Sequence, residues 1–192
     1  MDDSKYYDGY FDELAAAIGL LDRKEVFKAV DILCSAYKSG KAVYSMGNGG
    51  SAATASHFSN EFGKCCRALP KGGFRVQCLC DSVPQLTAFA NDDGYDSCFS
   101  GQLEPVLSEG DVLFCISGSG NSPNVVKAAE LARKRKAKVI ALTGFSGGRL
   151  REMGDAKIHL AHGHWGRIED VHMVLVHYLG NHVRERFKQA VA

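Results

Sequence analysis

The chain has 192 residues, of which 45% are hydrophobic and 23% are charged, and its formal net charge is +1. This length and composition are ordinary for a globular protein with one sizeable core. The near-neutral charge gives no electrostatic footprint for nucleic acid or for an anionic membrane. No apolar run approaches the roughly 20 residues that span a bilayer. The first residues, MDDSKYYDGYFDEL, are acidic and polar, which is not typical of a secretory signal.

Seven cysteines are spread along the chain, an odd number with no CxxC pair. Several lie in apolar runs, where cysteine behaves as a small hydrophobic residue. The adjacent Cys65 and Cys66 match no known spacing for a thiolate metal site. We therefore expect reduced thiols and a cytoplasmic location.

Two amphipathic helices are expected before the first strand. Apolar residues recur at three- and four-residue spacings over 6–21 and again over 26–37. Ser39 and Gly40 end the second helix. Because two leading helices are not part of a minimal nucleotide-binding fold, we expect residues 1–40 to cover the sheet or a partner subunit. The α/β core would then occupy residues 41–192.

From Lys41 onward, strand patterns alternate with helix patterns. The apolar runs predict five strands, at Ala42–Met46, Arg75–Leu79, Val112–Ile116, Lys138–Leu142 and Lys157–Leu160. Helices are expected over 51–62, 84–90, 98–107, 123–136, 148–153 and 167–188, with 91–94 as a loop. This alternation predicts an α/β fold, with a central parallel five-stranded sheet covered by helices on both faces. Ligands bind such sheets beyond the carboxyl ends of the strands.

A glycine-rich turn follows the first expected strand, in the stretch SMGNGGSAATASHFSNE (Ser45–Glu61). A strand, a glycine-rich turn and a helix start together direct backbone N–H groups toward an anion. Ser51 can cap the helix or donate its hydroxyl to a phosphate. The pattern is neither GxGxxG nor GxxxxGK[ST], so it is not a nucleotide fingerprint. The alternative is a tight turn that binds no ligand.

A second loop, ISGSGNSPNV, also follows a buried strand and opens a helix. It supplies hydroxyl groups from Ser117, Ser119 and Ser122, next to the flexible Gly118 and Gly120. Three hydroxyls and several N–H groups at one helix N-terminus can surround a phosphate without any lysine. Serine-rich turns also occur for purely local reasons. Two such loops at one edge of the sheet favour an anion site.

These two loops, with HFSNE (57–61), RIEDVHMVLVH (167–177), NDDGYD (91–96) and LTG (142–144), resemble the sugar isomerase (SIS) domain family. Within it they are most similar to the sedoheptulose 7-phosphate isomerases, also called phosphoheptose isomerases. The resemblance covers nearly the whole chain and implies a single SIS domain over 1–192, a three-layer αβα sandwich. It also implies a homotetramer with active sites at subunit contacts. The implied reaction converts D-sedoheptulose 7-phosphate to D-glycero-D-manno-heptose 7-phosphate.

The same resemblance implies a role for each matching residue. Glu61 is expected to be the catalytic base and His177 its acid/base partner. Substrate contacts are expected from residues in both loops, in the NDDGYD segment and on the last helix: Asn48, Gly49, Ser51, Asp92, Ser117, Gly118, Ser119, Ser122 and Glu169. Some members of the family bind zinc, and the matching metal ligands are His57, Glu61, Glu169 and His177.

The chemistry of these residue types agrees with that expectation. Ketose–aldose interconversion moves a proton between neighbouring carbons through an enediol, which needs a base, an acid and a grip on the phosphate. A bound metal could instead polarise the carbonyl. His57 and Glu61 are four residues apart and share one helix face, whereas Glu169 and His177 are separated by roughly 80° around their helix. The four side chains therefore meet only if the two helices face each other.

Three positions depart from the pattern of the heptose isomerases. Glu169 replaces a Gln, Gly166 an Asp and Gly118 a frequent Thr. These changes weaken the assignment of the exact sugar and leave phosphosugar binding intact. Two alternatives stay open: an isomerase of another phosphosugar, and a non-catalytic tetrameric scaffold of the replication-initiator-associating type. A scaffold has no reason to keep both Glu61 and His177. For the neighbouring His172 we expect structural hydrogen bonding.

Overall fold

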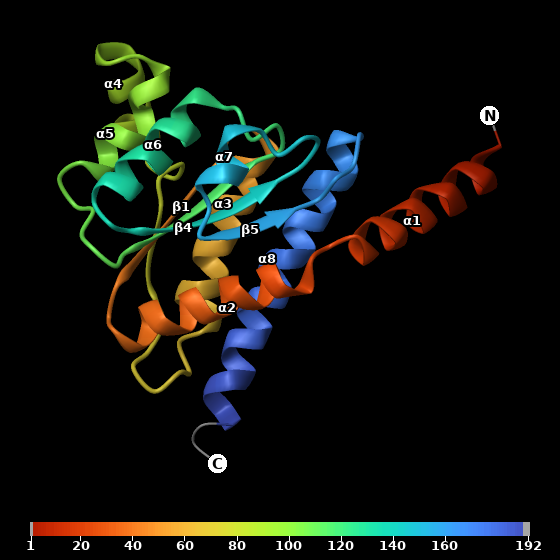
Figure 1. Ribbon diagram of the computed structural model, residues 1–192, viewed down its shortest axis with the longest axis horizontal. Coiled ribbons are helices and arrows are strands. Elements are labelled where there is room, and N and C mark those ends of the chain that lie inside the picture. Colours follow the sequence, from red (N-terminus) through yellow and green to blue (C-terminus); the bar gives the residue numbers. More distant parts are fainter. Residues whose placement is uncertain (1, 190–192) are drawn as a thin grey trace.

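A five-stranded, all-parallel sheet forms the centre of the protein in the computed structural model, which describes residues 2–189 (Figure 1). Its strands are β1 (Ala42–Met46), β2 (Arg75–Cys78), β3 (Val112–Ser117), β4 (Lys138–Thr143) and β5 (Ala156–His159). They are hydrogen-bonded in the order β2-β1-β3-β4-β5. The predicted α/β fold and all five predicted strands are confirmed.

Helices connect the strands and cover the sheet. They are α1 (Asp3–Gly19), α2 (Arg23–Lys38), α3 (Gly50–Asn60), α4 (Val83–Asp92), α5 (Cys98–Leu103), α6 (Pro123–Lys134), α7 (Gly148–Met153) and α8 (Trp165–Gln189). A π-helical turn at Glu61–Cys65 continues α3, and a 3₁₀ turn at Tyr95–Ser97 precedes α5. In the described part of the chain, no helix combines the length and the apolar character that a membrane crossing requires.

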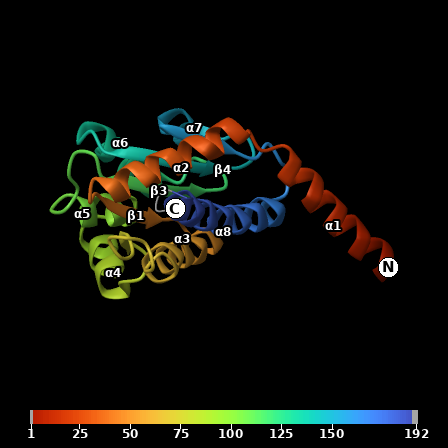
Figure 2. The same ribbon diagram turned by 90° about the horizontal axis from the view of Figure 1, so that it is seen from below.

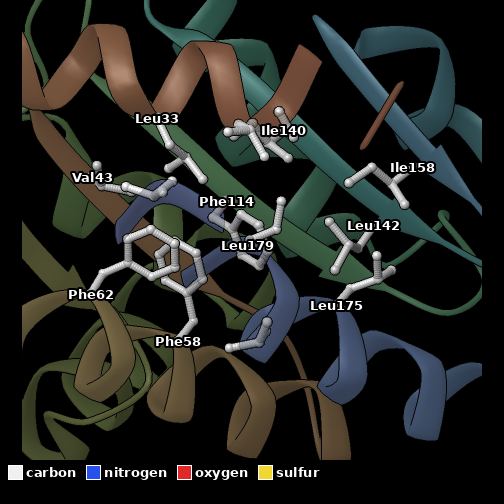
Figure 3. Close-up of a cluster of buried hydrophobic side chains, with 14 of the residues drawn as sticks. Leu33, Val43, Phe58, Phe62, Phe114, Ile140, Leu142, Ile158, Leu175 and Leu179 are labelled. Atoms are coloured by element: carbon white, nitrogen blue, oxygen red, sulfur yellow. The ribbon is translucent and has the colours of Figure 1, made fainter. Parts of the chain in front are cut away.

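Each strand contributes side chains to both faces of the sheet because successive residues alternate in direction. On one face, Leu33 of α2, Phe58 of α3 and Leu179 of α8 gather around Phe114 of β3 (Figure 3). The rings of Phe58 and Phe114 stack with their centroids 4.0 Å apart. On the other face, α5, α6 and α7 pack on the alternate strand residues, such as Leu113. Helices on both faces give the predicted three layers.

The strand order reverses direction next to β1. The chain passes from β1 to β2 on one side, and then places β3 on the other side of β1. In open parallel sheets, ligands bind in the crevice beyond such a reversal point. The two glycine-rich loops that were singled out from the sequence follow β1 and β3, so both lie at this crevice.

Helix α1 extends away from the rest of the protein, as Figures 1 and 2 both show. Its attachment to α8 is polar: the Tyr10 hydroxyl donates to the Asp170 carboxylate at 2.5 Å, and the Arg167 guanidinium lies 3.4 Å from the centre of the Tyr10 ring. Glu13 also pairs with Arg167 at 3.0 Å. The aromatic residues of the first turns are exposed: Tyr6, Tyr7 and Phe11.

Several element ends differ from the predictions, and three of them bear on the site. The helix expected over 51–62 changes to π-helical geometry at Glu61. The helix expected over 98–107 begins at Cys98 as predicted, after a 3₁₀ turn, but ends at Leu103. Asp92, expected in a loop, is the last residue of α4. Apolar periodicity locates a helix but does not determine its last turn, which depends on tertiary contacts.

Candidate active site

Three potential metal ligands meet between α3 and α8. His57, Glu61 and His177 each offer a ligand atom, and these atoms all lie within 4.8 Å of one another. The Nε2 atoms of His57 and His177 are 2.8 Å apart. Within residues 2–189, this is the single cluster of His, Cys, Asp or Glu side chains with such spacing. Two histidines and a carboxylate can hold a divalent metal ion.

The cluster forms because α3 and α8 run side by side in the same direction. Gly50 at the start of α3 lies against Glu169, and His57 in its last two turns contacts His177. Glu61, which follows α3, lies over Gly180. A Cβ atom at Gly180 would be 2.6 Å from Cγ of Glu61, so this glycine provides the space for the carboxylate. The two helices therefore face each other, which is the condition for these side chains to meet.

Glu61 is buried, with 6% of its surface exposed, at the first position of the π-helical turn. Its Oε1 accepts a hydrogen bond from Nη1 of Arg184 at 2.5 Å. The same guanidinium donates from Nη2 to Asn181, whose side chain donates to the carbonyl of His177. Single π-helical turns inside α-helices are frequent at functional sites. Sequence reasoning did not anticipate either Arg184 or this turn.

Glu169 lies apart from the three-residue group. Its carboxylate is against Gly50, where an added Cβ would be 2.3 Å from Oε2. This position is the N-terminus of α3, where the helix dipole favours a negative charge. The expected fourth metal ligand is thus at the first loop, about two turns away from His57 along α3.

The first loop is fixed by an amide pair across the crevice. Asn48 and Asn124 exchange two hydrogen bonds, each 2.9 Å long, between their side chains. The Tyr95 hydroxyl also donates to Oδ1 of Asn48, at 2.8 Å. Asn124 is 1% exposed and lies in the first turn of α6. It was not predicted, although its place directly after the second serine loop was a usable signal.

The remaining first-loop residues lie at the start of α3. Gly49 is exposed and has a φ of 56°, in the region that favours glycine. Ser51 is buried beside Gly47, whose added Cβ would be 2.7 Å from the Ser51 side chain. Asp92 is exposed at the end of α4, and its carboxylate accepts a hydrogen bond from Asn91.

The serine loop surrounds the N-terminus of α6. The hydroxyls of Ser117 and Ser122 are 3.1 Å apart, and the Ser119 hydroxyl accepts from the backbone N–H of Asn121 at 3.2 Å. Ser117 is buried and Ser119 is exposed. Gly118 has open space, since an added Cβ would meet no atom closer than 3.9 Å. The three hydroxyls therefore lie together between the end of β3 and the start of α6.

Gly120 holds this loop against the loop that follows β4. It has a φ of 66°, and an added Cβ would be 1.8 Å from the carbonyl oxygen of Gly147. The backbone N–H of Gly144 also donates to the Gly118 carbonyl at 2.8 Å. The close approach of two backbones therefore fixes the shape of the serine loop.

His172, on the same helix as His177, is buried within the protein and only 1% exposed. Neither of its ring nitrogens has a hydrogen-bond partner among the protein atoms of residues 2–189. The expected structural hydrogen bonding is therefore not formed with regular geometry, although the Thr143 backbone interacts with the ring. Burial lowers the pKa of His172 to about 4, because the charged imidazolium would lose its hydration.

The fold and these loops define the class of protein. A model of the SIS domain family matches residues 6–144, so the chain belongs to the SIS domain family. A phosphoheptose isomerase from Hamiltonella defensa is 42% identical over 156 residues, which cover 80% of this chain and 74% of that protein. One from Mycobacterium tuberculosis is 42% identical over 154 residues, covering 80% of this chain and 78% of the relative. Within the SIS domain family, the chain belongs with the phosphoheptose isomerases.

Solved structures give the same result for the fold. The phosphoheptose isomerase of Neisseria gonorrhoeae is 30% identical and superposes with a TM-score of 0.86, covering 95% of this chain and 98% of that one. The phosphoheptose isomerase of Francisella tularensis is 27% identical with a TM-score of 0.87, covering 96% and 100%. The two leading helices and the sheet thus belong to one shared architecture.

Proposed function

We propose that this chain is an aldose–ketose isomerase that converts D-sedoheptulose 7-phosphate to D-glycero-D-manno-heptose 7-phosphate. The observation that carries the proposal is the meeting of His57, Glu61 and His177 beside the crevice that the two loops line. The identity to phosphoheptose isomerases favours this activity over a non-catalytic scaffold.

Glu61 is the proposed base. It takes a proton from C1 of the ketose, and a proton delivered to C2 of the enediol completes the aldose. His177 is the proposed acid/base partner, which moves the second proton between the oxygens on C1 and C2. The burial of Glu61 supports this role, because a buried carboxylate is shielded from bulk water and held in one orientation.

The phosphate of the substrate is proposed to bind the second loop, at Ser117, Gly118, Ser119 and Ser122. Asn48, Gly49, Ser51, Asp92 and Glu169 are proposed to contact the sugar hydroxyls.

Zinc is the proposed metal, held by His57, Glu61 and His177. Catalytic zinc sites use three protein ligands and keep one position open. Tetrahedral zinc places two histidine nitrogens roughly 3.3 Å apart, so the 2.8 Å between the two Nε2 atoms needs only a small opening. When bound, the ion would polarise the substrate carbonyl. Glu169 would join the ligands only after leaving the start of α3.

We further propose that residues 1–192 form one SIS domain that assembles as a homotetramer. The exposed aromatic side chains of α1, Tyr6, Tyr7 and Phe11, support a role for residues 1–40 in subunit contacts. All seven cysteines are free thiols, which supports a cytoplasmic location.

The test is a turnover assay with D-sedoheptulose 7-phosphate, with and without added zinc and after chelation, that follows the aldose product. Turnover that chelation abolishes and zinc restores would support both the substrate and the metal. Turnover that is indifferent to the chelator would support the isomerase with Glu61 and His177 alone. Folded protein with no turnover under any condition would refute the proposed substrate.

A further inference from the structure

Arg184 connects the candidate base to the rest of the site. It lies on α8, seven residues and two turns after His177, on the same side of the helix. Its Nη1 donates to Oε1 of Glu61 at 2.5 Å, and its Nη2 donates to Oδ1 of Asn181 at 2.6 Å. Asn181 in turn donates to the carbonyl oxygen of His177 at 2.9 Å.

This ion pair differs from an ordinary surface ion pair. The Glu61 side chain is 7% exposed and the Arg184 side chain 22% exposed. A pair withdrawn from water is weakly screened, and its planar guanidinium donates in a fixed geometry. Because Asn181 holds the second end of the guanidinium, Arg184 has little freedom to swing away from Glu61.

The contact also occupies one particular atom of the carboxylate. Oε1 of Glu61 accepts from Arg184, whereas Oε2 accepts no hydrogen bond from any protein group in the described residues 2–189. Gly180 leaves the space in which the carboxylate lies, as an added Cβ there would be 2.6 Å from Oε1. One oxygen is thus anchored, and the other carries no hydrogen bond from the described protein groups.

We propose that Arg184 is a positioning residue for the isomerase: it anchors Glu61 through Oε1 and thereby presents Oε2 to the substrate proton or to a metal ion. The inference rests on the proposed function, in which Glu61 is the base. Arg184 does not itself contact the reacting atoms. Partners of this kind, which hydrogen-bond a ligating or catalytic carboxylate, typically contribute 10- to 100-fold in metal affinity or activity.

The experiment compares Arg184→Met with Arg186→Met. Arg186 lies two residues further along α8 and makes an ion pair with Asp31 of α2, away from Glu61. The Arg184→Met enzyme is expected to lose about 10- to 100-fold in kcat with KM changed by less than about threefold, and to bind zinc at least about tenfold more weakly. The Arg186→Met enzyme is expected to keep kcat, KM and zinc affinity.

A folded Arg184→Met protein with wild-type kcat and zinc affinity would overturn the proposal. So would a KM that rises while kcat is unchanged, because that pattern would place Arg184 in substrate binding. If Arg184→Met does not fold, Arg184→Lys decides the question. A single ammonium group cannot bridge Glu61 and Asn181 in the same geometry, so a loss on the order of tenfold in kcat is expected, and a wild-type kcat would refute the role.

The zinc measurement separates this proposal from the proposed function. If wild-type protein binds zinc and does not turn over sedoheptulose 7-phosphate, the substrate assignment fails, and weaker zinc binding by Arg184→Met still supports the anchoring of Glu61. If Arg184→Met then binds zinc as tightly as the wild type, the anchoring role of Arg184 is rejected. If wild-type protein turns over its substrate without binding zinc, the change in kcat decides alone.

Discussion

The Nε2 atoms of His57 and His177 lie 2.8 Å apart, although the two residues are 120 positions apart in the sequence. At this distance one ring donates a hydrogen bond to the other. The packing of α3 against α8 brings these two rings together. The same packing places Glu61 over Gly180, so the position of the candidate base depends on how these helices pack.

Gly180→Ala is expected to lower kcat by at least about tenfold, because a small displacement of a catalytic group can cost as much as 100-fold. The added Cβ would be 2.6 Å from Cγ of Glu61 and would push the carboxylate aside. Helix propensity alone favours alanine over glycine by about 1 kcal/mol, so helix α8 itself is not weakened. Steady-state kinetics measure the effect. Gly9→Ala on α1, where an added Cβ meets nothing within 4 Å, is the matched control and should keep wild-type kcat.

Gly120→Ala is expected to lower the free energy of unfolding by at least about 2 kcal/mol, because it combines a left-handed conformation with a backbone clash. Gly120 has a φ of 66°, and its added Cβ would be 1.8 Å from the Gly147 carbonyl oxygen. The free energy of unfolding is measured in urea for both variants, with Gly118→Ala as the control. An added Cβ at Gly118 would meet no atom closer than 3.9 Å. Equal stabilities for the two variants would show that the serine loop does not need this close contact.

Asn124→Leu is expected to raise KM for the phosphosugar with a smaller effect on kcat. The change removes both hydrogen bonds that hold Asn48 and leaves its amide without its buried partner. Tyr95 would still donate to Asn48, so a partial loss of about tenfold in kcat/KM is expected. A KM equal to that of the wild type would mean that Asn48 is not part of the substrate contact.

His172 is expected to make the protein less stable in mild acid. The pKa of His172 is about 4 in the folded state, against 6.5 for an ordinary histidine. Below pH 6.5 the unfolded chain therefore binds a proton that the folded chain rejects, so the stability is full above pH 6.5 and falls as the pH drops toward 4. Between pH 7.5 and pH 5, the titration of His172 lowers the free energy of unfolding by about 2 kcal/mol.

The check is urea unfolding at both pH values for the wild type and for His172→Leu. The apolar variant removes the titrating group. Its free energy of unfolding should therefore fall by about 2 kcal/mol less than that of the wild type between pH 7.5 and pH 5. The same pH dependence in both proteins would contradict the assignment to His172.

The sequence allowed most of the fold to be predicted, because each strand is a short apolar run with a clear break after it. The two loops were also recognisable, since glycine and serine at a strand-to-helix junction have a local physical meaning. The pairing of His57 with Glu61 followed from helix periodicity. Their meeting with His177 depends on the facing of two helices, which helix periodicity does not determine and the structure shows.

Other features of the site could not be predicted from local patterns. Arg184 contacts Glu61 from 123 positions away, and Asn124 contacts Asn48 from 76 positions away. Such contacts depend on the rotation and register of packed helices, which periodicity does not determine. The turn at Glu61 and the burial of His172 are likewise consequences of tertiary packing.

The most direct measurement of the central claim is the turnover of sedoheptulose 7-phosphate by Glu61→Gln beside the wild type. Glutamine keeps the shape of the side chain and an oxygen that can accept from Arg184, and it removes the base. The account predicts that kcat falls by about 10² to 10⁴, while calorimetry still detects phosphosugar binding. A variant that binds the sugar and turns it over within tenfold of the wild-type rate would contradict the role of Glu61 as the base.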